Sequence, residues 1–278
     1  MAKLTIADDD EALARVAAER IATLIGQSIG SSGSATVSLT GGSTPRRLYT
    51  LLGDATYPWR HRIDWGRLHL FWGDERHVPP EHPDSNFGMA RAALLDHVPV
   101  PPSHIHRMRG EIPDANEAAR DYEQELRAGF AAAGRSEPTF DIMMLGLGED
   151  AHIASIFPES DLVGRPVKGR PTPDERGATA ENVGRPFTGR RVAAVWPPHL
   201  GAWRITLTPP ALLDAAGIVV VVAGDRKAPS VHAAIEGPLD IARWPAQILR
   251  QAGDRVEWML DRSAAAGLRT GEGVSDRA

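Results

Sequence analysis

The chain has 278 residues, of which 42% are hydrophobic, and a formal net charge of −5 at pH 7. This length suits one large domain with a substantial core, and we expect a single α/β domain over residues 1–268. The negative charge argues against nonspecific binding to nucleic acid or anionic membranes, so an anionic ligand needs a local positive patch. The absence of cysteine excludes disulfides, thiolate nucleophiles and cysteine-ligated metal sites.

The N-terminal segment becomes acidic at once, at Asp8–Asp10, and shows no apolar signal core. No window approaches the roughly 20 apolar residues that a membrane-spanning helix needs. We therefore expect a cytoplasmic protein with no membrane partner and no nucleic-acid partner. The sequence leaves the oligomeric state open.

Short apolar runs alternate along the chain with amphipathic segments. The runs predict strands at 35–39, 67–72, 140–145, 191–196, 203–208, 217–223 and 256–260. The amphipathic segments predict helices at 10–29, 46–52, from 83–88 to about 96, 116–133, near 154, 209–216 and from 224–227 toward 235. Residues 161–190 lack periodicity and predict a long loop or lid, and the tail 269–278 is expected to be disordered. The alternation predicts an α/β fold with a doubly wound, mostly parallel sheet flanked by helices.

The run 140–145 leads into a turn that is the main candidate site, Leu145-Gly-Leu-Gly-Glu-Asp-Ala-His152. Its two glycines allow a tight turn and close approach of a ligand to the backbone. Asp150 and His152 place a carboxylate and an imidazole at a strand end, where open α/β sheets bind ligands. The alternative interpretation is a turn whose histidine only caps or packs.

A second turn, Thr40-Gly-Gly-Ser-Thr-Pro45, joins a predicted strand to a predicted helix. Gly41 and Gly42 free the backbone, while Ser43 and Thr44 add hydroxyls at the positive end of the helix dipole. Such a turn suits a phosphate, although it has neither the lysine of a P-loop nor the three glycines of a dinucleotide fingerprint. The alternative is a capped turn that binds nothing.

Two further strands end in glycine-bearing polar turns. One turn carries Asp74 and Arg76, charges that are costly to bury unless they are paired or used, so a salt-bridged strand end is the alternative there. The other turn carries Lys227. If the four strands are parallel, all four turns lie at one edge of the sheet, where such folds bind ligands. Together they predict a site for a small, phosphorylated, hydroxyl-rich molecule.

A proline-rich loop is expected at 98–109, and three histidines lie in it or directly before it, His97, His104 and His106. Their spacing does not place them on one face with acids, so we interpret them as ordinary loop residues rather than metal ligands. We expect neither a metal nor another cofactor.

Several motifs occur together in a fixed order. They are Leu39-Thr-Gly-Gly-Ser-Thr-Pro45, Phe71-Trp-Gly-Asp-Glu-Arg76, Val78-Pro-Pro80, Pro83-Asp-Ser-Asn86, Leu145-Gly-Leu-Gly-Glu-Asp150 with His152, Ala154-Ser-Ile-Phe-Pro158 and Arg204-Ile-Thr-Leu-Thr208. With them the chain resembles the glucosamine-6-phosphate isomerase/6-phosphogluconolactonase family over most of its length. The resemblance implies the fold shared with glucosamine-6-phosphate deaminase and ribose-5-phosphate isomerase. It also implies metal-free hydrolysis of 6-phospho-D-glucono-1,5-lactone to 6-phosphogluconate, the second step of the oxidative pentose phosphate pathway.

The central turn departs from the family's usual Asp-Gly-His-Thr run at two positions, Ala151 and Ile153. Alanine tolerates a positive φ poorly, so the turn must keep a permitted backbone or shift slightly. Ile153 lacks the hydroxyl of threonine, which matters only if that hydroxyl reaches the ligand.

Two alternatives to lactone hydrolysis stay open. The deaminase relatives continue the central turn as Phe-Asn-Glu-Pro, and the different run here, Ser155–Glu159, favours the lactonase over a glucosamine-6-phosphate deaminase or another sugar-phosphate isomerase. A sugar-phosphate effector domain of a transcription regulator is disfavoured, because no basic helix-turn-helix precedes the first predicted helix.

Lactone hydrolysis needs a water, a base and a positive group for the developing oxyanion. We assign His152 as the general base, with Asp150 or Asp74 to orient its ring. Arg76 is the candidate that binds substrate oxygens or stabilises the oxyanion. No Gly-x-Ser-x-Gly pattern indicates an acyl-enzyme. The residues expected to bind the substrate, chiefly its phosphate, are Gly41, Gly42, Ser43, Thr44 and Arg204 or Lys227.

Overall fold

The computed structural model describes residues 2–163 and 189–269. Its centre is a six-stranded sheet of order β1-β9-β8-β5-β2-β3, in which every neighbouring pair is parallel. The strands are β1 (Lys3–Ala7), β2 (Ala35–Leu39), β3 (Leu68–Trp72), β5 (Phe140–Leu145), β8 (Ala215–Val222) and β9 (Val256–Asp261). The predicted parallel sheet is confirmed, although the sequence did not reveal β1. The predicted lid and the disordered tail fall mostly on 164–188 and 270–278, which lie outside the described residues.

A second, antiparallel sheet consists of β4 (Asp74–Arg76), β7 (Arg204–Leu207) and β6 (Val192–Val195). Only Gly73 separates β4 from β3, so the chain passes directly from one sheet to the other. The Gly73 amide donates to the Leu39 carbonyl of β2 at 2.9 Å, and the Gly73 carbonyl accepts from the Leu207 amide of β7 at 2.8 Å. The second sheet therefore stands at the carboxyl edge of the first.

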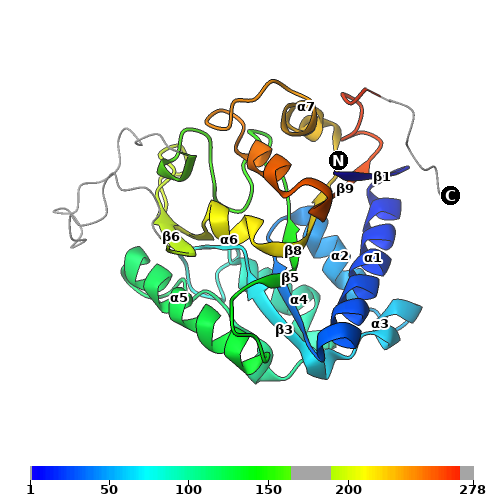
Figure 1. Cartoon of the computed structure of the whole chain (residues 1–278), viewed down its shortest axis with the longest axis vertical. Coiled ribbons are helices and arrows are strands. Elements are labelled where there is room, and N and C mark those ends of the chain that lie inside the picture. The colour runs from blue at the N-terminus through cyan, green and yellow to red at the C-terminus, as the bar shows by residue number, and fades with distance from the viewer. Residues whose placement is uncertain (1, 164–188, 270–278) are drawn as a thin grey trace.

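Helices cover both faces of the parallel sheet. They are α1 (Asp10–Ser32), α2 (Ser43–Gly53), α3 (Pro58–Arg62), α4 (Asn86–Ala93), α5 (Ala115–Ala132), α6 (Pro209–Leu213) and α7 (Ala228–Ile235). Figure 1 shows α1, α2 and α3 on one side of the strands and α5 on the other. Neighbouring side chains of β3 follow this division, because successive strand residues point to opposite faces: Phe71 stacks on Phe130 of α5, and Trp72 contacts Phe87 of α4.

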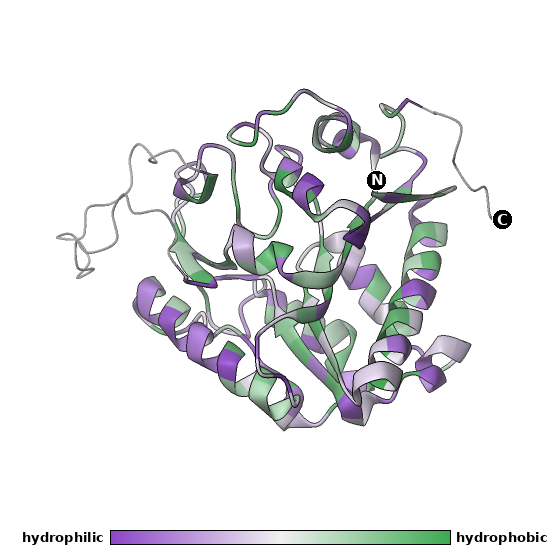
Figure 2. Cartoon of the chain, in the orientation of Figure 1, coloured by the Kyte–Doolittle hydropathy of each residue, from purple (hydrophilic) through white to green (hydrophobic). Residues whose placement is uncertain are grey.

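Burial explains why the strand predictions succeed. Every residue of β2 and of β3 is buried, as expected for parallel strands covered on both faces. The hydropathy colouring shows apolar strands in the interior and polar patches along the outward faces of the helices (Figure 2). No helix among the described residues is long and apolar enough to cross a membrane.

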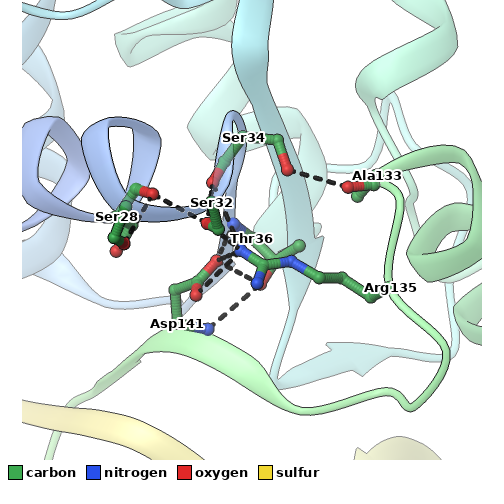
Figure 3. A network of polar contacts seen from close by, with 8 residues as sticks. Ser28, Ser32, Ser34, Thr36, Ala133, Arg135 and Asp141 are labelled. Carbon is green, nitrogen blue, oxygen red and sulfur yellow. Dashed lines mark hydrogen bonds and ion pairs between the residues drawn. The ribbon is translucent and has the colours of Figure 1, made fainter.

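A polar network holds the amino-terminal ends of β2 and β5 together (Figure 3). The Asp141 carboxylate accepts hydrogen bonds from the Thr36 amide at 2.8 Å, the Thr36 hydroxyl at 2.9 Å and the Arg135 guanidinium at 2.8 Å. The Asp141 amide in turn donates to the Thr36 hydroxyl at 3.0 Å. These contacts fasten the two central strands at the edge opposite the glycine-bearing turns.

The helix predicted to begin near Ala154 is wrong. The segment that follows β5 runs as consecutive tight turns with an antiparallel bridge between Ile153 and Ile156. Ala151 has φ of +61°, Ala154 has +48° and Glu159 has +57°. These left-handed conformations cannot belong to a right-handed helix, and they store backbone strain next to the candidate site.

Candidate active site

The strands β2 and β5 are neighbours at the point where the strand order reverses. From β2 the chain moves outward to β3, and from β5 it moves the other way to β8 and β9. Such a switch point leaves a crevice beyond the carboxyl ends of the strands. A cleft of about 200 Å³ lies here, and turns from all four predicted strand ends line it. Its lining includes Gly41, Gly42, Ser43, Thr44, Asp74, Arg76, Asn86, Gly146, Gly148, His152, Ala154 and Lys227.

A histidine–carboxylate pair lies at this cleft, and its histidine, His152, lines it. His152 Nδ1 lies 2.5 Å from Asp150 Oδ1, and the His152 backbone amide donates to the same oxygen at 3.2 Å. Because a carboxylate only accepts, Nδ1 carries the proton, and Nε2 is the nitrogen left to take one. Phe157 packs on the ring, with centroids 4.5 Å apart. A Cβ at Gly148 would lie 2.1 Å from Nδ1, so only glycine leaves room for the pair.

The ionisation of Asp150 suits this arrangement. Burial alone would raise the pKa of Asp150, but the hydrogen bonds from the His152 ring and amide, with the attraction of the imidazolium charge, hold that pKa below its ordinary value. The carboxylate is therefore ionised at neutral pH and fixes both the tautomer and the orientation of the ring.

Asp74 forms its hydrogen bonds with residues other than His152. Its Oδ2 accepts from the Ser155 hydroxyl at 2.7 Å. The side-chain amide of Asn86 donates to the Asp74 backbone carbonyl at 2.9 Å and to Asp74 Oδ1 at 3.3 Å. Asp74 is only 7% exposed and makes no hydrogen bond to His152. Of the two carboxylates that the sequence offered for orienting His152, the structure gives the contact to Asp150.

The turn after β2 ends in an uncapped helix start. Gly42 is the N-cap of α2, and among the described residues no side chain accepts from the first amides of this helix. Those amides and the hydroxyls of Ser43 and Thr44 stand at the positive end of the helix dipole, an arrangement that suits an anion. The Tyr49 hydroxyl donates to the Thr40 carbonyl and accepts from the Thr40 amide, each at 2.9 Å, and so fixes the approach to the turn.

Three cations give the site the local positive patch that the net charge of the chain does not supply. Lys227 and Arg76 line the cleft, and Arg204 stands opposite Arg76 in the β4–β7 register. Burial lowers the pKa of Arg204, and repulsion from Arg76 lowers it further. Burial also lowers the pKa of Lys227, against the attraction of Glu149 and Asp150. Within the described ranges, no carboxylate lies within ion-pair distance of these three side chains.

Sequence reasoning did not select Asn86 or Ser155 as site residues. Asn86 lines the cleft, and both side chains converge on Asp74. Each lies inside a motif that the sequence displays, at 83–86 and at 154–158, and these motifs were the only signal that could have pointed to them. Ile153 is buried in the core and does not line the cleft, so the missing hydroxyl has no direct route to a ligand there.

Two histidines of the proline-rich loop, His104 and His106, make specific contacts with β3 and α5. His106 Nδ1 lies 2.8 Å from Glu125 Oε1, and its Nε2 lies 3.2 Å from Nδ1 of His69 on β3. His104 stacks on His69 with centroids 3.9 Å apart. Even so, no group of three or more histidine, aspartate or glutamate side chains within 2–163 and 189–269 is arranged to hold a metal ion.

The sheet order and the cleft at its carboxyl edge define a doubly wound α/β protein with a small-molecule site. The sequence profile of the family described as glucosamine-6-phosphate isomerases/6-phosphogluconolactonase matches residues 8–258. The chain therefore belongs to this family.

Individual relatives agree with this assignment. A 6-phosphogluconolactonase of Synechocystis sp. is 34% identical over 250 residues, which cover 90% of this chain and 91% of the relative. The solved 6-phosphogluconolactonase of Trypanosoma brucei superposes with a TM-score of 0.75 at 26% identity, covering 97% of this chain and 99% of that one. A monomeric glucosamine-6-phosphate deaminase shares the fold, with a TM-score of 0.72 at 20% identity, covering 96% of this chain and 100% of that one. The expectation of a shared lactonase and deaminase fold is confirmed.

Proposed function

We propose that this protein is a lactone hydrolase that converts 6-phospho-D-glucono-1,5-lactone to 6-phospho-D-gluconate, the second step of the oxidative pentose phosphate pathway. The observation that carries the proposal is the His152–Asp150 pair, 2.5 Å apart, whose His152 lines the same cleft as the uncapped start of α2. The family membership and the relatives named as 6-phosphogluconolactonases support the substrate.

The first half of the reaction adds water to the lactone. His152 Nε2 takes a proton from the water as its oxygen attacks carbon 1, and the ionised Asp150 stabilises the imidazolium that results. The carbonyl oxygen becomes an oxyanion. Arg76 lines the cleft without a carboxylate partner within the described ranges and supplies positive charge to that oxygen.

The second half opens the ring. The tetrahedral intermediate collapses, the bond between carbon 1 and the ring oxygen breaks, and His152 returns its proton to the leaving ring oxygen. The product is an open-chain carboxylic acid that ionises at neutral pH. No protein–substrate bond forms at any step, so the reaction needs no nucleophilic side chain.

The phosphate of the substrate is held at the turn that follows β2. The amides of Gly41 to Thr44 at the start of α2 donate to its oxygens, and Lys227 adds a charge from the turn after β8. Arg204, the register partner of Arg76 in the β4–β7 pair, adds a further positive charge near the phosphate.

The test is an assay with freshly prepared lactone, corrected for spontaneous hydrolysis and read out as 6-phosphogluconate. The wild-type chain is expected to accelerate hydrolysis, and His152→Ala to lower kcat by on the order of 100-fold or more. His199→Ala is the matched control, because His199 also contacts Phe157 but is exposed and does not line the cleft. A folded His152→Ala variant with the wild-type rate would contradict the role of His152.

The alternative activity is deamination of glucosamine 6-phosphate, since a deaminase shares the fold. Incubation with glucosamine 6-phosphate and measurement of released ammonia separates the two. We expect no ammonia above the background of a heat-inactivated sample.

A further inference from the structure

Glu75 is a buried carboxylate close to the cleft that does not line it. It is 2% exposed, and its two oxygens accept four hydrogen bonds. Oε1 accepts from the amides of Asn86 at 2.7 Å and Arg76 at 2.8 Å. Oε2 accepts from the amide of Phe87 at 2.8 Å and the hydroxyl of Ser85 at 3.1 Å. The mechanism above uses none of these contacts, although a buried charge with four donors is an expensive feature to retain.

Three of the four donors belong to the start of α4. Ser85 is the N-cap of this helix and accepts from the Gly88 amide at 3.0 Å while it donates to Glu75. The amides of Asn86 and Phe87 are orphan donors of the first helical turn. Glu75 therefore compensates its charge with the positive end of α4, and within the described ranges it has no ion-pair partner.

The segment that Glu75 fixes reaches the cleft at two points. The Asn86 side chain donates to Asp74, and it lies so close to Gly41 that a Cβ there would be 1.9 Å from Asn86 Oδ1. One residue before Ser85, the Asp84 carbonyl accepts from the Arg76 guanidinium at 2.6 Å. The same short segment thus sets the position of the Gly41 turn and the direction of Arg76.

We propose that Glu75 is a positioning residue for the lactone hydrolysis: its ionised carboxylate fixes residues 84–87, and through them Asn86, Asp74 and Arg76. The inference rests on the proposed function, because its effect is read in that reaction. Glu75 itself does not touch the substrate.

The ionisation state of Glu75 determines which hydrogen bonds its carboxyl group can accept. The charged groups that interact with Glu75 are Asp74 on its own strand, Arg204 on β7 and Arg107 of the loop that precedes α5. Burial raises the pKa of Glu75 to about 7, while the amide donors of Phe87, Asn86 and Arg76 oppose the rise. A proton on Glu75 turns one acceptor into a donor that faces other donors, so the protonated carboxyl loses part of the hydrogen bonding that positions the segment.

The variant Glu75→Gln isolates this effect. A carboxyl group whose pKa is raised in the folded state does not stabilise the fold by ionising at neutral pH, so the neutral glutamine variant is expected to fold. Its amide group presents a donor to backbone donors, and kcat/KM for the lactone is expected to fall about 10- to 100-fold through misplacement of cleft residues. Asp141→Asn is the matched control, because Asp141 also accepts several hydrogen bonds but lies at the opposite sheet edge. It should keep the wild-type kcat/KM.

The pH profile gives a second readout that a purely structural role would not change. In the wild type, one of the protonations that lower kcat/KM on the acid side should belong to Glu75, whose pKa burial raises to about 7. In Glu75→Gln that protonation is removed, so the same limb should be less steep by one proton. Wild-type kcat/KM together with an unchanged acid limb in this variant overturns the inference.

Asn86→Ala keeps the inference testable if Glu75→Gln does not fold. This variant removes the side chain through which Glu75 acts on Asp74, and it should lose a similar part of kcat/KM. The wild-type kcat/KM in Asn86→Ala also overturns the inference. A wild-type chain that does not hydrolyse the lactone refutes the proposed function instead, so the two failures are distinguishable.

Discussion

The Ser155 hydroxyl donates a 2.7 Å hydrogen bond to Asp74, across a sequence separation of 81 residues. It joins the turn that carries His152 to the polar strand β4. The Ser155 amide also donates to Thr206 Oγ1 of β7 at 3.2 Å. Two strands of the antiparallel sheet therefore anchor the His152 turn. Asp74 anchors this turn through Ser155 and does not contact the imidazole.

Removing the hydrogen bond between Ser155 and Asp74 should lower both the stability of the fold and the activity. Ser155→Ala leaves Asp74 Oδ2 buried without its donor, which we expect to cost about 1–3 kcal/mol of unfolding free energy. The kcat for the lactone should also fall, because the His152 turn loses an anchor. Urea unfolding and steady-state kinetics measure the two effects. Ser263→Ala is the control, since Ser263 donates to Asp261 at 2.9 Å away from the cleft and its loss should leave kcat unchanged.

Asp150→Asn tests the tautomer that the His152 pair requires. Asparagine is neutral and can present a donor to Nδ1, so the imidazolium loses its stabilising charge and the ring can turn. We expect kcat to fall by on the order of 100-fold or more, with little change in KM. Glu149→Gln is the neighbouring control, because Glu149 is exposed and pairs with Arg226 at 2.8 Å. Equal rates for the two variants would argue against Asp150 as the orienting group.

Ala151→Gly tests the strain in the central turn. Relief of the left-handed conformation of Ala151 is worth about 1–2 kcal/mol, and it offsets the lost methyl burial and the extra backbone entropy of glycine, each about 0.5–1 kcal/mol. Unfolding free energy should therefore change by less than about 1 kcal/mol. The control Ala17→Gly, at a buried position inside α1, should lose more than about 1 kcal/mol. A large loss at position 151 would contradict the strain.

His69→Asn tests the buried histidine cluster. Burial, together with repulsion from the nearby His104 and His106, lowers the pKa of His69 to about 4. The unfolded chain, with an ordinary histidine pKa of about 6.5, binds the proton more readily, so stability is lost as the pH falls from about 6.5 toward 4. Asparagine can keep the donor to His106 but cannot take the proton.

The expected result is a shallower loss of unfolding free energy in His69→Asn than in the wild type, by about 1–3 kcal/mol between pH 7 and pH 4.5. Urea titrations at the two pH values measure it. His61→Asn, at an exposed histidine, should follow the wild type. If the two variants show the same pH dependence, the cluster does not contribute in this way.

The central strands were the most predictable part of the fold. Segments 35–39 and 140–145 match β2 and β5 to the residue, because each is a short, mostly buried run bounded by glycine or polar residues. The edge strand β1 was missed, since it pairs with β9 alone and leaves most of its residues partly exposed. The strand β4 was missed because Asp74 to Arg76 is polar and only three residues long.

The candidate site was predictable in outline and not in its contacts. Parallel strands bring their carboxyl ends to one edge, so four turns sufficed to place the cleft. The contact between Ser155 and Asp74 depends on tertiary packing, which no local pattern reports. The helix expected near Ala154 failed for the same reason: tertiary contacts hold two alanines in left-handed conformations that their intrinsic preference opposes.

The pairing of β1 with β9 has a consequence for how the protein is made. The ribosome synthesises β1 first and β9 last among these strands, and β9 lies between β8 and β1. Until residues 256–261 emerge, the nascent chain holds β8 as an open sheet edge and β1 as a strand without a partner. Such edges invite pairing with other chains. The interval before β9 emerges is therefore when a stalled or truncated chain is most prone to aggregate.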